Sequence, residues 1–128
     1  MAVAGANAIK GIDVTTYLVQ DPERAIAFYR DKLGLNVTEE YGGQGGEFTL
    51  ADGTTFGLWK MTDGSFRPSG GVMFAVDDLP AAVQQYRSRG VAFEDDGAIE
   101  ETPQCYMAFG TDSEGNSFIL HQRKTRSA

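Results

Sequence analysis

The chain has 128 residues, of which 41% are hydrophobic, and its formal net charge is −7. This size and composition predict one compact domain, residues 1–128, with a hydrophobic core. The acidic balance argues against nucleic acid and anionic membrane surfaces as partners, and no apolar run reaches the ~20 residues of a membrane span.

Two features of the sequence bear on its cellular location. The amino-terminal stretch MAVAGANAIK has no basic start followed by a long apolar run, so we expect no signal peptide. Cys105 is the only cysteine and cannot form an internal disulfide. A reducing cytoplasm is therefore the expected location.

Two similar halves follow one another along the chain. The first, residues 9–61, contains VTTYLVQDPERAIAFYRDKLGL, and the second, residues 71–122, contains GVMFAVDDLPAAVQQYRSRGV. Internal repetition of this kind indicates two copies of one supersecondary unit. Three pairs of identical residues repeat at a spacing of 57 positions, namely Asp21 and Asp78, Tyr29 and Tyr86, and Arg30 and Arg87.

Each half begins with an alternating apolar strand that leads into a helix. Asp21 is expected to cap the first helix, with Pro22 at its first position and Gly34 at its end. Asp78 and Gly90 delimit the second helix in the same way.

Three strand-like runs follow each helix, at 37–41, 46–50 and 54–61 and again at 92–99, 104–110 and 117–122. Asp52-Gly53 predicts a hairpin turn in the first half, and the turn at 113–116 matches it in the second. The fold class is therefore α+β, with two βαβββ modules forming a curved half-open barrel. Helices are expected on the outer face, and the concave face is left to hold a ligand.

These motifs resemble the vicinal oxygen chelate superfamily, which includes glyoxalase I, extradiol dioxygenases and bleomycin-resistance proteins. The matching stretches are 19–35, 76–91 and 109–121, and the resemblance extends over 9–122. It implies the glyoxalase/bleomycin-resistance fold and a homodimer in which the cup is completed across subunits. It does not fix the reaction, because this fold hosts many chemistries.

The resemblance also implies where a metal would bind. Metal-using members take their ligands from four strand positions, which here hold Val14, Gly57, Gly71 and Ile119. None of these side chains can coordinate a divalent cation. We therefore expect neither a metal nor another cofactor.

Strand alternation predicts which side chains line the cup. If Ile119 points inward, so does His121, which is the only histidine of the chain. The same reasoning turns five further residues inward, namely Val14, Thr16, Thr55, Trp59 and Met73.

His121 and Glu47 are the candidate catalytic residues. An inward His121 can bind an acidic or phenolic ligand or move a proton, whereas the alternative is a strand-end histidine at a dimer contact or in solvent. Either Glu47 or Phe48 must face the cup. A buried Glu47 carboxylate needs a partner such as His121, but a surface glutamate on an edge strand fits the sequence as well.

Aromatic residues are the other candidates for ligand binding. Trp59 suits a flat or aromatic ligand, and the alternative is ordinary packing at the mouth of the cup. Tyr106 can offer its hydroxyl to a ligand. Tyr41 is assigned to the core or an interface, and Cys105 to packing because no cation is evident that would activate its thiol.

Three functions remain open on the sequence. The first is a metal-free protein that binds a small, aromatic molecule. The second is a glyoxalase-like lyase, isomerase or other enzyme in which His121 and Glu47 form an acid–base pair, or hold a displaced metal with Tyr106. The third is a non-catalytic interaction module whose cup is filled by its own side chains.

Overall fold

The computed structural model describes residues 9–10, 12–61 and 66–124, and most of the amino-terminal stretch considered above lies outside these ranges. None of the helices in these ranges combines the length and the apolar character needed to cross a bilayer. The elements in chain order are β1 (Thr15–Val19), α1 (Pro22–Ala27), η1 (Phe28–Lys32), β2 (Asn36–Glu40), β3 (Gly45–Thr49), β4 (Thr55–Lys60), β5 (Val72–Ala75), α2 (Leu79–Ser88), β6 (Ala92–Phe93), η2 (Glu94–Gly97), β7 (Glu100–Glu101), β8 (Cys105–Thr111) and β9 (Ser117–Arg123).

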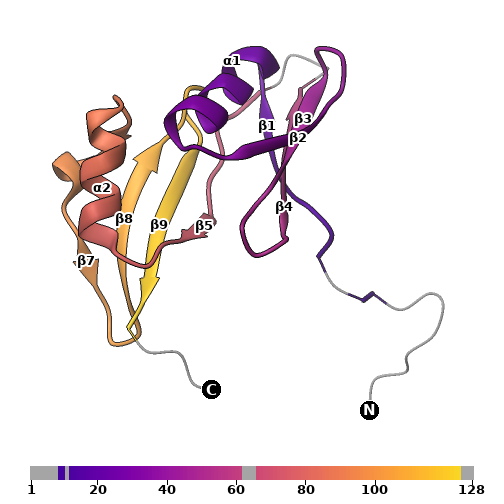
Figure 1. Cartoon of the computed structure of the whole chain (residues 1–128). Coiled ribbons are helices and arrows are strands. Elements are labelled where there is room, and N and C mark those ends of the chain that lie inside the picture. Colours follow the sequence, from indigo (N-terminus) through magenta and orange to yellow (C-terminus); the bar gives the residue numbers. More distant parts are fainter. Residues whose placement is uncertain (1–8, 11, 62–65, 125–128) are drawn as a thin grey trace.

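The strands form two sheets, each built from one of the two predicted halves. The first sheet has the order β1-β4-β3-β2, and the second has the order β5-β9-β8-β6 with β7 paired to β8. Figure 1 shows the first sheet on the right beneath α1 and the second sheet on the left beside α2. The predicted α+β architecture of two βαβββ units is confirmed.

Strand register confirms the internal repeat. β1 pairs in parallel with β4 so that Leu18 lies opposite Trp59, and β5 pairs in parallel with β9 so that Ala75 lies opposite His121. Leu18 and Ala75 are related by the 57-residue spacing of the repeat, while Trp59 and His121 each follow their turn glycine by six residues. The two halves therefore place equivalent residues at equivalent points of their sheets.

Both helices begin and end as the sequence predicts. Asp21 and Asp78 each accept the backbone N–H of the third helical residue, at 3.1 Å in both cases. α1 continues without a break into η1, a π-helical turn. Gly34 and Gly90 follow the helices with φ of 72° and 88°, a conformation that favours glycine.

The helix-covered faces of the two sheets share one aromatic core. Phe74 of β5 meets Phe56 of β4 edge to face, with 5.3 Å between ring centroids, and Phe28 of η1 lies 6.4 Å from Phe118 of β9. The Tyr29 ring contacts Phe74 as well, at 6.3 Å. Offset and edge-on aromatic pairs of this kind add specific contacts to the area that they bury. The sheet faces on the opposite side are left uncovered.

The predicted strand at 92–99 is wrong over most of its length. Only β6 is extended there, and the chain then turns through η2 before β7 pairs with β8. Asp95 and Asp96 take φ of 49° and 55°, in the left-handed region. Aspartate enters this region more readily than most residues because its short polar side chain bonds locally, so it can end a strand where an apolar pattern suggests continuation.

Candidate functional site

The candidate site lies on the face of the first sheet that is turned away from α1, which we call the first open face. Along β1, Tyr17 and Val19 are buried in the core, while Thr16 and Leu18, which alternate with them, are exposed. In β3 and β4, Phe48 and Phe56 are likewise buried. Alternation therefore places their neighbours on the first open face, namely Val14, Thr16, Leu18, Glu47, Thr55, Gly57 and Trp59.

Two aromatic side chains stack on this face. The rings of Tyr41 and Trp59 lie 4.9 Å apart, are inclined by only 17°, and remain 37% and 36% exposed. Tyr41 reaches this place because Gly42 and Gly43 turn the chain with positive φ, and its N–H then donates to the carbonyl of Gly45 at 2.9 Å. Gly45 lies opposite Trp59 in the β3–β4 register. A flat apolar platform is thus presented to solvent.

A carboxylate borders the aromatic platform. Partial desolvation and the nearby charge of Glu47 raise the pKa of the Tyr41 phenol above its ordinary value, with Glu39 adding to the effect. Glu47 is half-buried, and Phe48 beside it is fully buried, so Glu47 is the member of this pair that faces the open side. The platform therefore combines stacking surface with a hydrogen-bond acceptor.

Three side chains of the first open face come together around the buried Gly57. A Cβ at this position would lie 3.3 Å from Val14 Cγ1, 3.4 Å from Thr16 Oγ1 and 3.7 Å from Glu47 Cγ. The absence of a side chain at Gly57 allows the methyl group of Val14 and the hydroxyl of Thr16 to pack close to the backbone of β4. Thr55 lies two residues away on the same side of β4 and is half-buried.

The second sheet has its own uncovered face. Met73 lies opposite Ile119, and Ala75 lies opposite His121, while the alternate residues of β9 pack into the core. Met73 is 52% exposed, and His121 is half-buried beside Met107 of β8. The predicted orientation of Met73, Ile119 and His121 away from the helix agrees with this burial pattern.

Tyr106 lies on the other side of the second sheet. Tyr106 pairs with Gln122 across the β8–β9 ladder, one position from the Met107–His121 pair, so its side chain takes the opposite face of the sheet from His121. It packs against the core, with Lys124 above its ring at 5.1 Å. Cys105 alternates with Tyr106 and so shares the face of Met107 and His121, but it is buried, and its sulfur lies 3.1 Å from Thr102 Oγ1.

The structure does not bring Glu47 and His121 together within one protomer. Glu47 belongs to β3 and His121 to β9, which are strands of different sheets. No hydrogen bond or ion pair joins them within the ranges described. Two strand spacings of ~4.8 Å already separate β3 from the β1 edge of its own sheet.

The family's metal does not fit the residues of this chain. Val14 and Gly57 lie together on the first open face, and Ile119 lies on the uncovered face of the second sheet. Neither these residues nor Gly71 carry an oxygen, nitrogen or sulfur donor in their side chains. Over the part of the chain that the structure covers, no three or more histidine, cysteine, aspartate or glutamate side chains gather as a metal site would require. No step of a mechanism is therefore assigned to a metal.

Tyr41 is the residue whose position sequence reasoning did not foresee. The predicted strand 37–41 ends on Tyr41, but β2 ends at Glu40, so strand alternation does not determine the direction of this side chain. The available signal is the glycine pair that follows it, because a tight turn returns the chain alongside β4 and so brings Tyr41 next to Trp59.

Comparison with known proteins agrees with the fold. The profile of the Glyoxalase/Bleomycin resistance protein/Dioxygenase superfamily matches residues 11–120. A search of curated proteins finds no significant match to this chain.

Solved structures with this architecture come from several bacteria. TnmS3, an antibiotic binding protein from Streptomyces sp. CB03234, shares 24% identity over 91% of this chain and 98% of its own, with a TM-score of 0.75. Lactoylglutathione lyase from Agrobacterium tumefaciens shares 19% identity over 89% of this chain and 94% of its own, with a TM-score of 0.73. A superfamily member from Sphaerobacter thermophilus DSM 20745 shares 22% identity over 89% of this chain and 98% of its own, with a TM-score of 0.75. At these identities the likeness shows the fold alone, but the profile covers most of the sequence. The chain belongs to the glyoxalase/bleomycin resistance protein/dioxygenase superfamily.

Proposed function

We propose that this protein binds a small aromatic molecule on the first open face without using a metal. The carrying observation is the stacked pair of Tyr41 and Trp59, which leaves about a third of each side chain exposed on an otherwise uncovered sheet. Exposed aromatic surface of this kind is costly in water and is typical of a binding face. The structural likeness to an antibiotic binding protein supports the same class of function.

The surroundings of the pair define the ligand further. A planar ring can stack on Trp59, while the Glu47 carboxylate accepts a hydrogen bond from a ligand N–H or O–H group. The hydroxyl of Thr16 beside Gly57 can donate or accept a second bond. We therefore expect a flat ligand that carries at least one hydrogen-bond donor.

We further propose that two copies assemble in the cytoplasm and cover the two open faces. Leu18 and Met73 are 42% and 52% exposed, in addition to the aromatic pair, which leaves much apolar surface uncovered for a single protomer. A homodimer that joins the first open face of one copy to the second sheet of the other would close a cup around the ligand. Light scattering after size-exclusion chromatography should report a dimer, and a monomer at micromolar concentration would contradict this arrangement.

An enzymatic function is the second candidate, and one observation favours it. Glu47 and His121 both belong to uncovered faces, so a dimer of this kind can bring the carboxylate of one copy to the imidazole of the other. An acid–base pair would then act on a ligand between them. If turnover of a small carbonyl or aromatic substrate is found and survives both His121→Ala and Glu47→Gln, this second candidate is wrong.

The binding proposal is tested on protein purified without chelators. Native mass spectrometry should show a bound organic molecule, either as isolated or after aromatic compounds are added. Elemental analysis should find no stoichiometric divalent metal. For an aromatic compound that binds, Tyr41→Ala should weaken the affinity by up to about tenfold, since an aromatic contact contributes ~0.5–1.5 kcal/mol beyond its buried area. Ile99→Ala, which alters another exposed side chain, is the matched control. A stoichiometric metal, or equal losses in both variants, would overturn the proposal.

A further inference from the structure

The repeat creates two equivalent junctions where the hairpin turn of one half approaches the strand–helix connection of the other. The β8–β9 turn (112–116) meets the start of α1, and the β3–β4 turn (50–54) lies beside the end of β5 and α2. The two turns share one backbone geometry. In the first, Asp112 N–H donates to the Asn116 carbonyl at 2.9 Å, and in the second, Leu50 N–H donates to the Thr54 carbonyl at 2.9 Å. We call them the closed junction and the open junction.

Polar side chains fill the closed junction. The buried Glu114 carboxylate accepts the N–H groups of Gln20 and Asp21 at 2.7 and 3.0 Å and pairs with Arg24. These groups fix the turn to the start of α1.

A second set of bonds completes the closed junction. Asp112 accepts the Tyr29 hydroxyl at 2.7 Å, and the fully buried Asn116 accepts the Ser69 N–H at 2.8 Å. Asn116 also donates to the carbonyl of Leu18 at 3.3 Å. The buried side chains of the turn thus bind both halves of the chain.

The open junction has the same residue positions with different chemistry. Leu50 stands where the closed junction has Asp112, Asp52 replaces Glu114, and Asp77 replaces Gln20. The Asp52 carboxylate bonds to the N–H and hydroxyl of Thr54 at 3.0 and 2.6 Å and makes no hydrogen bond to the start of α2. A carboxylate in the position of Glu114 would approach the side chain of Asp77, and like charges at short range repel.

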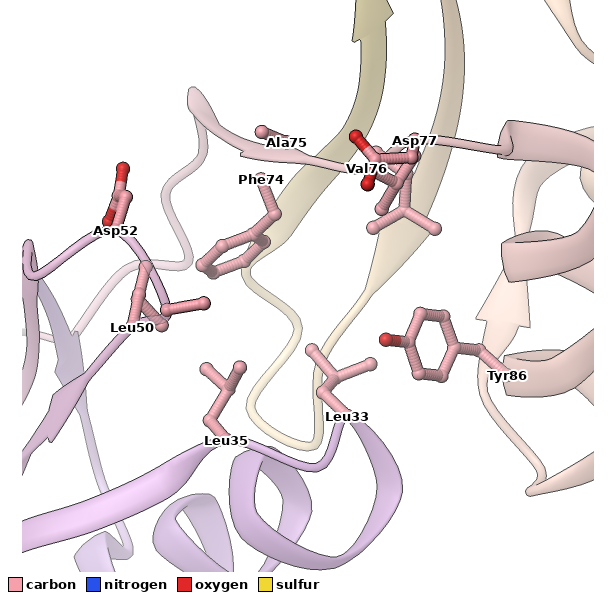
Figure 2. A pocket seen from close by; sticks show the side chains of 11 residues that line it. Leu33, Leu35, Leu50, Asp52, Phe74, Ala75, Val76, Asp77 and Tyr86 are labelled. Atoms are coloured by element: carbon pink, nitrogen blue, oxygen red, sulfur yellow. The ribbon is translucent and has the colours of Figure 1, made fainter.

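The hydroxyl of Tyr86, on the α2 side of the open junction, has no acceptor in the turn. Tyr86 is the repeat equivalent of Tyr29, but Leu50 offers its hydroxyl no acceptor, and within the ranges described it has no hydrogen-bond partner. Figure 2 shows this hydroxyl directed toward the hollow between Leu33 and Val76.

A cavity of about 370 Å³ remains in the open junction. This volume falls in the range of small-molecule sites, ~300–1,000 Å³. Asp52 and Asp77 stand on opposite sides of its upper rim in Figure 2, with Phe74 between them and lower in the cavity. Its apolar wall consists mainly of Leu33, Leu35, Leu50, Phe74, Val76 and Leu120.

The charge of the lining has one sign. Two carboxylates line the cavity and no basic side chain does. The bonds from Thr54 lower the pKa of Asp52, so this group is ionised at neutral pH. The guanidinium of Arg89 lies 5.7 Å from the centre of the Tyr86 ring, but it is engaged by the carbonyl of Lys32 at 3.1 Å.

We propose that the open junction binds a small organic cation, namely a protonated primary amine on an aromatic or branched aliphatic body. The body fills the apolar wall, and the ammonium group at the rim donates charge-assisted hydrogen bonds to the carboxylate of Asp52 or of Asp77. This site goes beyond the function proposed above, because Phe74 and Leu120 belong to the helix-covered side of the second sheet and Trp59 to the uncovered side of the first.

Isothermal titration calorimetry at neutral pH tests the site with 2-phenylethylamine and tryptamine. Neutral 2-phenylethanol and anionic 3-phenylpropionate are the matched probes, and we expect both to bind at least tenfold more weakly than 2-phenylethylamine. The double variant Asp52→Asn/Asp77→Asn should weaken amine binding at least tenfold. Glu23→Gln/Glu40→Gln removes the same charge from exposed positions and should change the affinity by less than twofold.

Two further variants locate the bound amine and exclude indirect effects. Leu50→Phe should abolish amine binding by filling the cavity, and circular dichroism checks that the variant folds. The loss caused by Asp52→Asn/Asp77→Asn should be equally large in a Trp59→Ala background, which separates this site from any amine binding on the first open face. The proposal is overturned if neither amine binds wild-type protein at millimolar concentration, if the alcohol binds as well as the amine, or if the double variant binds normally.

Discussion

The closed and open junctions show how one backbone can serve two purposes. Both are built from the same turn and the same approach of one half to the other, yet one is filled by carboxylate and amide groups and the other retains a cavity. The difference lies in side chains: at the closed junction each buried carboxylate accepts hydrogen bonds, whereas at the open junction two carboxylates stand on opposite sides of an apolar cavity. A repeat can therefore hold its halves together at one junction and keep the other available.

The largest difference between the two junctions is expected when the central carboxylate of each is removed and the loss of stability is compared. Glu114→Ala leaves two backbone N–H groups and Arg24 without their acceptor, and we expect a loss of ~2–3 kcal/mol in the free energy of unfolding. Asp52→Ala removes only the local turn bonds of an exposed carboxylate and should reduce the free energy of unfolding much less. Urea denaturation measures both. Similar losses in the two variants would show that the open junction is as important for stability as the closed one.

Giving the open junction the polar side chains of the closed junction should fill its cavity with hydrogen-bonded groups. The variant Leu50→Asp/Asp52→Glu/Asp77→Gln restores an acceptor for Tyr86 and removes the facing aspartate. Its free energy of unfolding should exceed that of Leu50→Asp alone by ~1 kcal/mol, because the new carboxylates accept hydrogen bonds. The triple variant should also no longer bind 2-phenylethylamine. Denaturation and calorimetry check the two effects. If the triple variant is no more stable than the single one, the side chains at these positions do not explain the difference between the junctions.

The closed junction should also be visible in the dependence of stability on pH. Burial, followed by the charge of Asp112 and its hydrogen bond, raises the pKa of Tyr29 well above its ordinary value of 10.0. Above that pH an unfolded chain loses the proton that the folded chain keeps, so the stabilisation by neutral Tyr29 is complete below pH 10 and declines as the pH rises.

The stability difference between wild type and Tyr29→Phe should therefore be constant at ~1–2 kcal/mol below pH 10 and narrow above it. Urea denaturation between pH 8 and 11 makes the measurement. A difference that stays constant over the whole interval would contradict a buried, hydrogen-bonded phenol in the closed junction.

Local pattern was sufficient for most of the architecture. The capping aspartates, the terminal glycines and the 57-residue repeat predicted the two helices and the two similar halves, because helix caps and strand alternation depend on neighbouring residues. The pattern also predicted the direction of Trp59 and His121 on their strands. It failed where the backbone left regular structure, at Asp95 and Asp96, and it extended a strand to Tyr41, which lies just beyond the end of β2.

Contacts between the halves were decided only by the tertiary structure. The sequence established which residue types occur at each repeat position, including Glu114 against Asp52 and Asp112 against Leu50. It could not show that Glu114 meets the start of α1, more than 90 residues earlier in the chain, or that Tyr86 faces a cavity. Such contacts depend on how two separately formed sheets pack on a common core, which no local spacing encodes.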